Sequence, residues 1–167
     1  MITRIKDFEY HWTQEFDKTQ RIFKHIPNRA LSQEVAPGYR TIARLAWHIA
    51  VTISAMMSKT GLPISESYKD ASLPSSMSSI AQAYSGSALE LMDMIKAKWT
   101  DETLQITDQL YGQIWKRGYT LTALIFHQIH HRGQMTVLMR QAGLEVPGLY
   151  GPARHEWASW GQSEPVV

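Results

Sequence analysis

The sequence predicts an all-α protein: a four-helix bundle with a long connection between helices two and three and a short C-terminal helix. Apolar residues recur at helical spacing over four long segments, whereas β-branched residues rarely alternate with polar ones over the length of a strand. The 167 residues are 44% hydrophobic and 19% charged, which is typical of one domain with a real core. We therefore expect a single domain over residues 1–167, in which four long amphipathic helices pack as a bundle.

The first two helices are expected over residues 3–26 and from about residue 39 to residue 60. Pro27 ends the first because its ring cannot continue a helix, and Gly61 followed by Pro63 ends the second. One face of the second helix is apolar and carries Ile42, Leu45, Ala46, Ile49, Ile53 and Met56. Residues 62–76 are rich in Ser and Pro and predict a long connection, so helices two and three need not be antiparallel partners.

The third and fourth helices are expected over residues 77–99 and 120–142. Between them, residues 100–118 fit either an extended segment or a short helix. Gly143 follows the fourth helix, where a left-handed residue commonly ends a helix. Residues 147–152 then predict a turn-rich loop, and a short helix is expected through Trp157 and Trp160.

The composition excludes several classes of function. Seventeen Lys and Arg stand against 15 Asp and Glu without forming a basic run, so we expect no nucleic-acid partner. The absence of Cys excludes disulfides, thiolate zinc sites, iron–sulfur clusters and a Cys nucleophile. The N-terminus lacks an apolar signal core, and no stretch of 18 uncharged apolar residues occurs. We therefore expect a cytoplasmic protein with no membrane partner.

A pair of histidines on the fourth predicted helix is the strongest functional signal. His131 lies in the middle of the apolar stripe, His127 about 40° to one side of it, and His130 about 100° away. Imidazoles at positions i and i+4 project side by side and can bind one cation at about 2.0–2.1 Å. Two buried imidazoles need either a metal or hydrogen-bond partners. From this helix alone, a metal site and a hydrogen-bonded polar core are equally consistent with the sequence.

A third ligand would have to come from another helix. His48 lies in the middle of the second predicted helix, on the flank of its apolar stripe, where it can face a neighbouring helix. The alternative role for His48 is that of an interfacial histidine at a helix crossing. His25 precedes Pro27 and is expected to cap a helix end, and His11 is expected on a solvated face.

Two segments resemble the signatures of the DinB/YfiT-like family of metal-dependent enzymes: LAWHI at residues 45–49 and HQIHHRGQ at residues 127–134. YGQ with a following Trp at residues 111–115, and VPGLYGP with a following EW at residues 146–157, are similar to that family too. The resemblance covers nearly the whole chain. It implies a four-helix bundle with a long second connection, frequent homodimers and a divalent metal bound by three histidines, which the motifs assign to His48, His127 and His131.

We expect the other residues of these motifs to have structural roles. We expect Arg132 and Gln134 to make helix-packing hydrogen bonds or surface pairs rather than to act in catalysis. Gly133 is expected to permit the close approach of another helix. The loop at residues 147–152 is expected to pack the end of the bundle rather than to bind substrate.

The expected function follows from an open metal site. Three imidazoles leave coordination positions free, and a divalent ion lowers the pKa of bound water or of a bound thiol. We predict a thiol transferase or hydrolase acting on a small molecule. Family members include enzymes that transfer low-molecular-weight thiols to electrophiles, and such a thiol is the expected partner. The alternative is a non-catalytic, metal-stabilised binding or stress-response module.

The metal is expected to be zinc or nickel, with iron or copper as alternatives, because imidazole suits all four. No carboxylate has the spacing of a general base, so no catalytic residue is assigned. A di-iron carboxylate site is excluded because it needs Glu-x-x-His pairs, and a zincin because it needs His-Glu-x-x-His.

Overall fold

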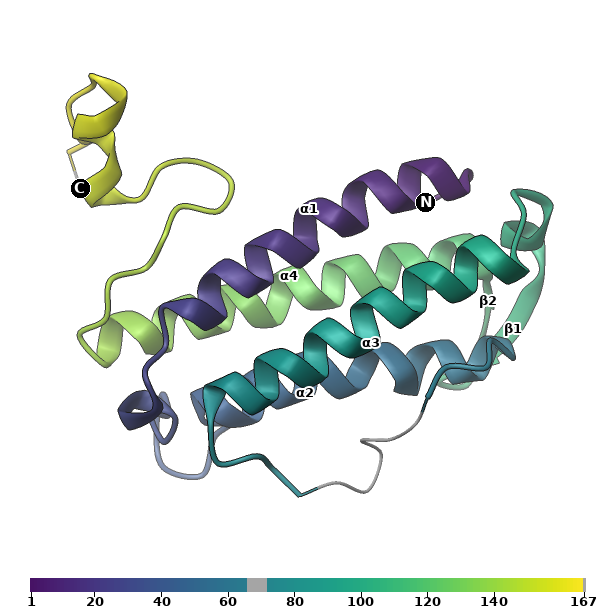
Figure 1. Cartoon of the computed structure of the whole chain (residues 1–167), viewed down its shortest axis with the longest axis horizontal. Helices are drawn as coiled ribbons and strands as arrows, with labels where there is room; N and C mark the ends of the chain where they lie inside the picture. The colour runs from purple at the N-terminus through teal and green to yellow at the C-terminus, as the bar shows by residue number, and fades with distance from the viewer. Residues whose placement is uncertain (66–71, 167) are drawn as a thin grey trace.

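The computed structural model describes residues 1–65 and 72–166, and four long helices form its main body (Figure 1). These helices are α1 (Ile5–Lys24), α2 (Ile42–Met57), α3 (Met77–Lys98) and α4 (Arg117–Gln141). They form a square in which α1 and α2 each contact both α3 and α4. The predicted all-α bundle is therefore confirmed.

The direction of the helices explains the long second connection. In Figure 1, α2 and α3 lie side by side and run the same way, while α1 and α4 run the opposite way. The chain must therefore return along the length of the bundle between Thr60, which ends a short 3₁₀ turn after α2, and the start of α3. The expectation that helices two and three need not be antiparallel is confirmed, although residues 66–71 of the connection lie outside the described part.

The helix ends are set largely by local signals. The side chain of Thr41 accepts a hydrogen bond from the backbone N–H of Arg44 at 3.2 Å and so caps α2. Ser76 caps α3 in the same way through the N–H of Ser79. Gly143 adopts the left-handed conformation after α4, with φ of 69°, as expected.

Residues 100–118 combine both of the expected alternatives. A 3₁₀ turn (Glu102–Gln105) is followed by an antiparallel hairpin of β1 (Thr107–Leu110) and β2 (Gln113–Lys116). Tyr111 and Gly112 form its two-residue turn, and both have positive φ, as a type I′ turn requires. The hairpin covers one end of the bundle (Figure 1).

The fourth helix begins at Arg117, three residues earlier than expected. Gly118 obscures this start in the sequence because glycine is a poor helix former. The glycine is needed there, since a Cβ at this position would overlap the backbone carbonyl of Ile2. The N-terminal segment therefore crosses directly over the first turn of α4.

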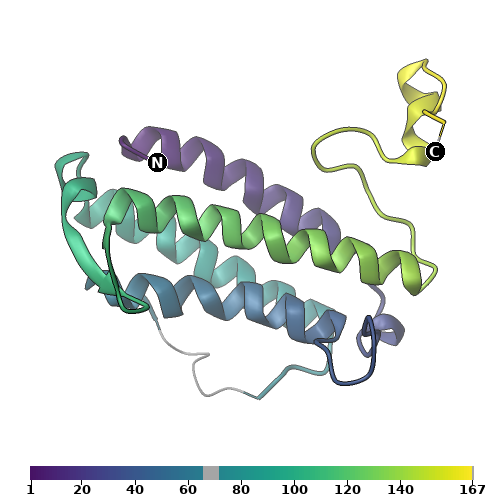
Figure 2. The same cartoon turned by 180° about the vertical axis from the view of Figure 1, so that it is seen from behind.

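The C-terminal segment leaves the end of α4 and finishes in a 3₁₀ helix (Arg154–Trp160) that stands clear of the bundle (Figure 2). Before it, the loop around residue 150 is attached to the helices. The hydroxyl of Tyr150 contacts Glu15 on α1 and Arg132 on α4, and Arg21 donates to the carbonyl of Gly148 at 2.9 Å. This loop packs against the bundle, as expected.

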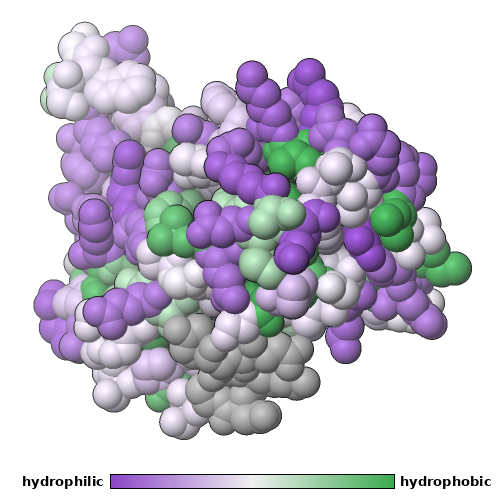
Figure 3. Space-filling model, turned by 45° about the vertical axis from the view of Figure 1, so that its right-hand side comes forward, coloured by the Kyte–Doolittle hydropathy of each residue, from purple (hydrophilic) through white to green (hydrophobic). Residues whose placement is uncertain are grey.

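A continuous apolar core fills the space between the four helices. Its fully buried members come from every helix and include Phe8, Ile22, Ile49, Ile53, Ile80, Leu91, Leu121, Leu124 and Met135. On the face shown in Figure 3, hydrophobic residues form small separate patches among hydrophilic ones. No helix in the described part of the chain is both long and apolar enough to cross a membrane.

Candidate metal centre

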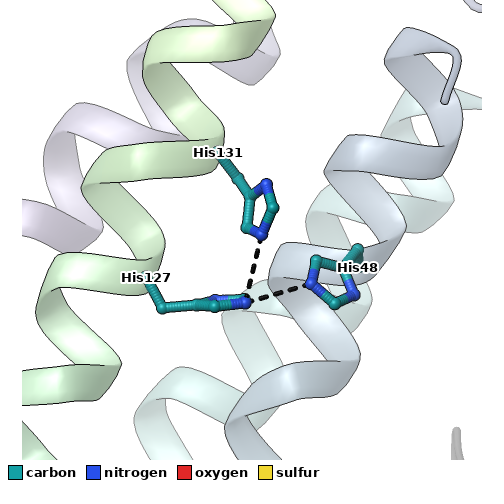
Figure 4. A group of neighbouring side chains, drawn as sticks. All are labelled: His48, His127 and His131. Carbon is teal, nitrogen blue, oxygen red and sulfur yellow. Dashed lines mark hydrogen bonds between the residues drawn. The ribbon is translucent and has the colours of Figure 1, made fainter. Parts of the chain in front are cut away.

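The three histidines named from the sequence lie together between α2 and α4 (Figure 4). The Nε2 atom of His127 is 3.0 Å from Nε2 of His48 and 3.1 Å from Nε2 of His131. Each of the three residues offers one nitrogen, and these atoms all lie within 4.8 Å of one another. In the described part of the chain, this is the group of His, Asp and Glu side chains whose geometry could hold a metal ion.

The packing of α2 against α4 determines this convergence. The two helices run antiparallel, so His48 in the middle of α2 faces the turn of α4 that carries His127 and His131. Beside them, the side-chain amide of Gln128 donates to the backbone carbonyl of Ile49 at 3.1 Å, and both residues are completely buried. This hydrogen bond holds one register of α4 along α2, and with it the relative height of the three rings.

The site keeps its imidazoles neutral. Burial, with the nearby positive charge of Arg40 and the neighbouring His131, lowers the pKa of His48 to about 4. Burial and the neighbouring His131 and His48 lower the pKa of His127 to about 4, and burial lowers the pKa of His131 as well. At neutral pH the three rings are therefore uncharged, and each keeps one nitrogen lone pair that a cation can bind.

The hydrogen of His131 can be assigned from its partner. Its Nδ1 atom lies 2.7 Å from Oε1 of Gln134, and an amide oxygen can only accept a hydrogen bond. Nδ1 therefore carries the hydrogen, and the lone pair of Nε2 is free to face the cluster. This is the arrangement in which a histidine acts as a metal ligand through Nε2.

Hydrogen bonding alone does not satisfy the cluster. A neutral imidazole has one N–H and one lone pair, yet Nε2 of His127 faces nitrogens of both His48 and His131. In either tautomer of His127, the Nε2 atom can make a proper hydrogen bond with only one of these two neighbours. Its Nδ1 atom is also buried, without a hydrogen-bond partner among the residues that the structure describes.

A divalent cation fits the same donor set. Nitrogens at about 2.0–2.1 Å from a tetrahedral metal lie about 3.3 Å apart, close to the 3.0 and 3.1 Å found between His127 and its two neighbours. A cation shared by three lone pairs would also remove the conflict at Nε2 of His127. The residues present therefore fit a three-histidine metal site with positions left for other ligands.

The other histidines have separate surroundings. His130 is exposed on the flank of α4, with its ring edge against His131 at a centroid distance of 4.8 Å. Nδ1 of His25 lies 2.8 Å from the carbonyl oxygen of Arg21 and caps α1, as expected. His11 is exposed, also as expected.

The motif residues that follow His131 have three different roles. Arg132 is completely buried and donates to the carboxylate of Glu15 and the hydroxyl of Thr19, so it packs α4 against α1, as expected. Gln134 instead bonds to His131 within its own helix. The expectation for Gly133 was wrong: a Cβ there would meet no atom of the described chain within 4 Å, because this side of α4 is exposed.

Two hollows meet the histidine cluster along the groove between α2 and α4. The first, which we call the loop hollow, has a volume of about 450 Å³ and is lined by residues that include Val35, Tyr39, Arg40, Leu45, His131 and Gln134. The second, the hairpin hollow, has a volume of about 520 Å³ and is lined by residues that include His48, Thr52, Met56, Tyr111, Trp115 and His127. The cluster therefore has approaches from both ends of the groove.

Sequence reasoning did not find Arg40 or the role of Gln134 toward His131. The position of Arg40 depends on how the loop before α2 folds back, and no motif marks it. The i, i+3 spacing of His131 and Gln134 is a usable signal, because residues three apart on a helix are neighbours.

Comparisons with known proteins agree over the length of the chain. A model of the DinB family matches residues 1–165. The chain is 41% identical to the Bacillus subtilis (strain 168) protein called "Uncharacterized protein YrdA", over 167 residues that cover all of both chains. It also resembles the crystal structure of a DinB-like protein from Bacillus cereus, with a TM-score of 0.85 and 41% identity, covering 90% of this chain and 100% of that one.

A more distant likeness supports the fold alone. The crystal structure of YjoA, a DinB-like protein from Bacillus subtilis, matches with a TM-score of 0.69 and 16% identity, covering 87% of this chain and 98% of that one. The helical bundle is thus shared among proteins whose sequences have diverged widely.

Proposed function

The chain belongs to the DinB family, and on that premise we propose that it is a divalent-metal-dependent transferase that activates a small thiol between His48, His127 and His131. The observation that carries the proposal is the convergence of three Nε2 atoms in a groove that opens on both sides. A closed structural site would surround its metal with four protein ligands, whereas three histidines leave room for a reactant.

The bound ion would supply Lewis-acid chemistry by lowering the pKa of a thiol, so that thiolate forms at neutral pH. The chain's own residues prepare the site for this. Gln134 holds the ring of His131 in the ligating tautomer, and the low pKa values of His48 and His127 keep both rings unprotonated. No catalytic acid or base is assigned, because no carboxylate joins the cluster in the described residues.

A transferase is favoured over a hydrolase because two hollows of similar size reach the cluster. A hydrolase needs one pocket and water, whereas a transfer between two molecules needs room for both. In the transfer we propose, the thiol loses its proton to solvent and its sulfur bonds to an electrophilic carbon of the second reactant. The leaving group departs with the electron pair of the bond that breaks.

The second candidate is a metal-stabilised module without chemistry. It is favoured by the position of the three histidines, which join α2 to α4 and would tie the two helices together when a cation binds. The two candidates differ in one respect that can be measured: a module needs no exchangeable ligand at the metal, whereas a thiol transferase must accept a thiol there.

The test is thiol binding and transfer by protein reconstituted with cobalt, whose absorption reports on its ligands. We expect mercaptoethanol to produce a thiolate-to-cobalt absorption band, and zinc-loaded protein to accelerate its reaction with chlorodinitrobenzene. The variant His131→Ala should lose both properties, and the matched variant His130→Ala, which changes an exposed neighbour, should keep them. A protein that binds cobalt but shows neither band nor transfer would instead be the non-catalytic module.

We further propose that the protein is a homodimer, as the family resemblance implies. The helix α4 supports this, because it exposes three large side chains to solvent: Tyr119 (44% exposed), Phe126 (63%) and Val137 (49%). Light scattering after size-exclusion chromatography should give twice the mass of the chain. A monomer at micromolar concentration would overturn this part of the proposal.

A further inference from the structure

The two hollows differ in charge. The hairpin hollow is lined mainly by apolar and aromatic side chains, among them Met56 and Trp115, and no Lys, Arg, Asp or Glu lines it. The loop hollow contains one full positive charge, the guanidinium of Arg40, beside the ring of Tyr39. His131 and Gln134 line the same hollow, so Arg40 and the metal-binding cluster share one space.

The backbone near Arg40 is anchored to the start of the loop that precedes α2. The loop that carries it is closed at its base by two hydrogen bonds, from the N–H of Ile42 to the carbonyl of Gln33 at 2.9 Å and from the N–H of Ala43 to the carbonyl of Leu31 at 3.0 Å. Thr41 then caps α2 directly after Arg40. The guanidinium therefore extends from an anchored point at the edge of the groove.

Arg40 has no acidic partner in the described part of the chain, where it takes part in no hydrogen bond or ion pair. Some other arginines do pair, Arg117 with Asp108, Arg132 with Glu15 and Arg154 with Glu164. Arg29 and Arg44 also lack an ion pair among the described residues, but neither lines the two hollows. The charge of Arg40 is nevertheless close enough to the cluster to lower the pKa of His48, His127 and His131. An unpaired cation beside a cation-binding site attracts an anion to the space between them.

We propose that Arg40 binds a carboxylate of the thiol that occupies the loop hollow, so that the protein selects acidic thiols over neutral or basic ones. The guanidinium suits this task because its planar fork of N–H donors matches the two oxygens of a carboxylate. The hairpin hollow, without charge, then receives the apolar electrophile. That the reactant is a thiol rests on the proposed function. The new inference concerns the charge of that thiol and the residue that selects it.

The experiment compares three thiols of similar size that differ in terminal charge: mercaptopropionate, mercaptoethanol and cysteamine. Each is titrated into cobalt-loaded protein, and the thiolate-to-cobalt band gives its Kd, which is a binding readout rather than an activity. We expect mercaptopropionate to bind about tenfold more tightly than mercaptoethanol, and cysteamine to bind more weakly than either. Because Arg40 is exposed, this preference should weaken as the salt concentration rises.

Two variants isolate the role of Arg40. The variant Arg40→Gln should reduce the preference for mercaptopropionate to within about twofold, because the charge-assisted pair is lost. The control Arg44→Gln removes an equal charge from an exposed position in the first turn of α2 and should leave the tenfold preference unchanged. A preference that survives in Arg40→Gln would overturn the proposal, since it would then arise from the metal or from general charge.

A second readout separates failure of this inference from failure of the proposed function. The NMR resonance of the Arg40 Nε–H group should shift when mercaptopropionate is added, and should not shift with mercaptoethanol. If no thiol gives a cobalt band, the proposed thiol transferase is wrong, and the Arg40 resonance still decides whether the loop hollow binds a carboxylate. If all three thiols bind equally and the resonance does not move, the role of Arg40 is wrong while the transferase stands.

Discussion

The Nδ1 atom of His131 lies 2.7 Å from Oε1 of Gln134, one turn further along α4. This hydrogen bond places the ring hydrogen on Nδ1 and leaves the lone pair of Nε2 facing His127, 3.1 Å away. Gln134 is not one of the three metal-binding residues, but it orients the ring of His131, which is. The arrangement repeats what is found around metal-binding histidines in general, where the second ring nitrogen donates to a fixed acceptor.

We predict that Gln134→Ala lowers the affinity for zinc by about 10- to 100-fold, the usual effect of removing a hydrogen-bond partner of a ligating histidine. Gln134 is exposed, so the free energy of unfolding of the metal-free protein should change little. Competition with a chromogenic chelator measures the affinity. The variant Gln134→Glu retains an acceptor and should recover most of it, whereas an unchanged affinity in Gln134→Ala would show that this hydrogen bond does not orient the ligand.

The metal-free protein should lose stability as the pH falls from about 6.5 to about 4. Unfolded histidine has a pKa of about 6.5, whereas the pKa values of His48 and His127 in the folded chain are about 4. Over this range the unfolded chain binds protons at these positions and the folded chain does not, so the free energy of unfolding decreases. Below about pH 4 both states are protonated, and these two residues add no further loss.

Urea denaturation in the presence of a chelator measures this dependence. The variant His127→Gln should show a shallower decrease across the same pH range than the wild-type protein. His11→Gln, which changes an exposed histidine, should follow the wild type. Identical pH profiles for His127→Gln and the wild type would mean that the His127 ring is not held neutral in the folded protein.

Removal of one partner from the buried ion pair between α1 and α4 should destabilise the protein strongly. Arg132 is 1% exposed and Glu15 is 6% exposed, so Arg132→Met would leave a buried carboxylate with Lys18 as its remaining charged partner. We expect the free energy of unfolding to fall by about 3–5 kcal/mol in urea denaturation. Arg140→Met, on the exposed side of the same helix, should change it by less than about 0.5 kcal/mol. Equal effects of the two substitutions would contradict a packing role for Arg132.

Two glycines of α4 should respond in opposite ways to alanine. At Gly133 a Cβ meets no described atom within 4 Å, so Gly133→Ala should raise the free energy of unfolding by about 0.5–1 kcal/mol through helix propensity. At Gly118 a Cβ would overlap the carbonyl oxygen of Ile2, so Gly118→Ala should destabilise the protein. Thermal unfolding of the two variants is the measurement. A loss of stability in Gly133→Ala would instead indicate that another helix packs closely against Gly133, as the sequence predicted.

The fold could be predicted almost completely because periodicity and helix-end signals agree over four long segments. Pro27 and Gly143 mark helix ends that the structure has within two residues of the prediction. For residues 100–118 the sequence did not decide between an extended segment and a short helix. The strands of the hairpin found there are only four residues long, and its turn depends on positive φ at Tyr111, a rare conformation for a side chain of that size. The early start of α4 was missed because the reason for Gly118 is a contact with a residue far along the chain.

The site was predictable to a smaller extent. The spacing of His127 and His131 and their place on an apolar stripe indicate convergence, because both follow from the geometry of one helix. The place of His48 on the flank of an apolar stripe favoured it as the third ligand, and the family resemblance then assigned it, since no local rule says which residue of another helix faces that pair. Arg40 and the two hollows depend on loop conformation and on the packing of the hairpin, which residue spacing does not determine.

The three-histidine metal site is most directly tested by the metal content of the protein, purified without a histidine tag and measured by elemental mass spectrometry. We expect about one divalent ion per chain in the wild type and in His130→Ala, and its loss in His48→Ala, His127→Ala and His131→Ala. Absence of metal from the wild type, even after reconstitution with zinc or nickel, would show that these histidines do not form a metal site. So would retention of the ion in all three variants of the cluster.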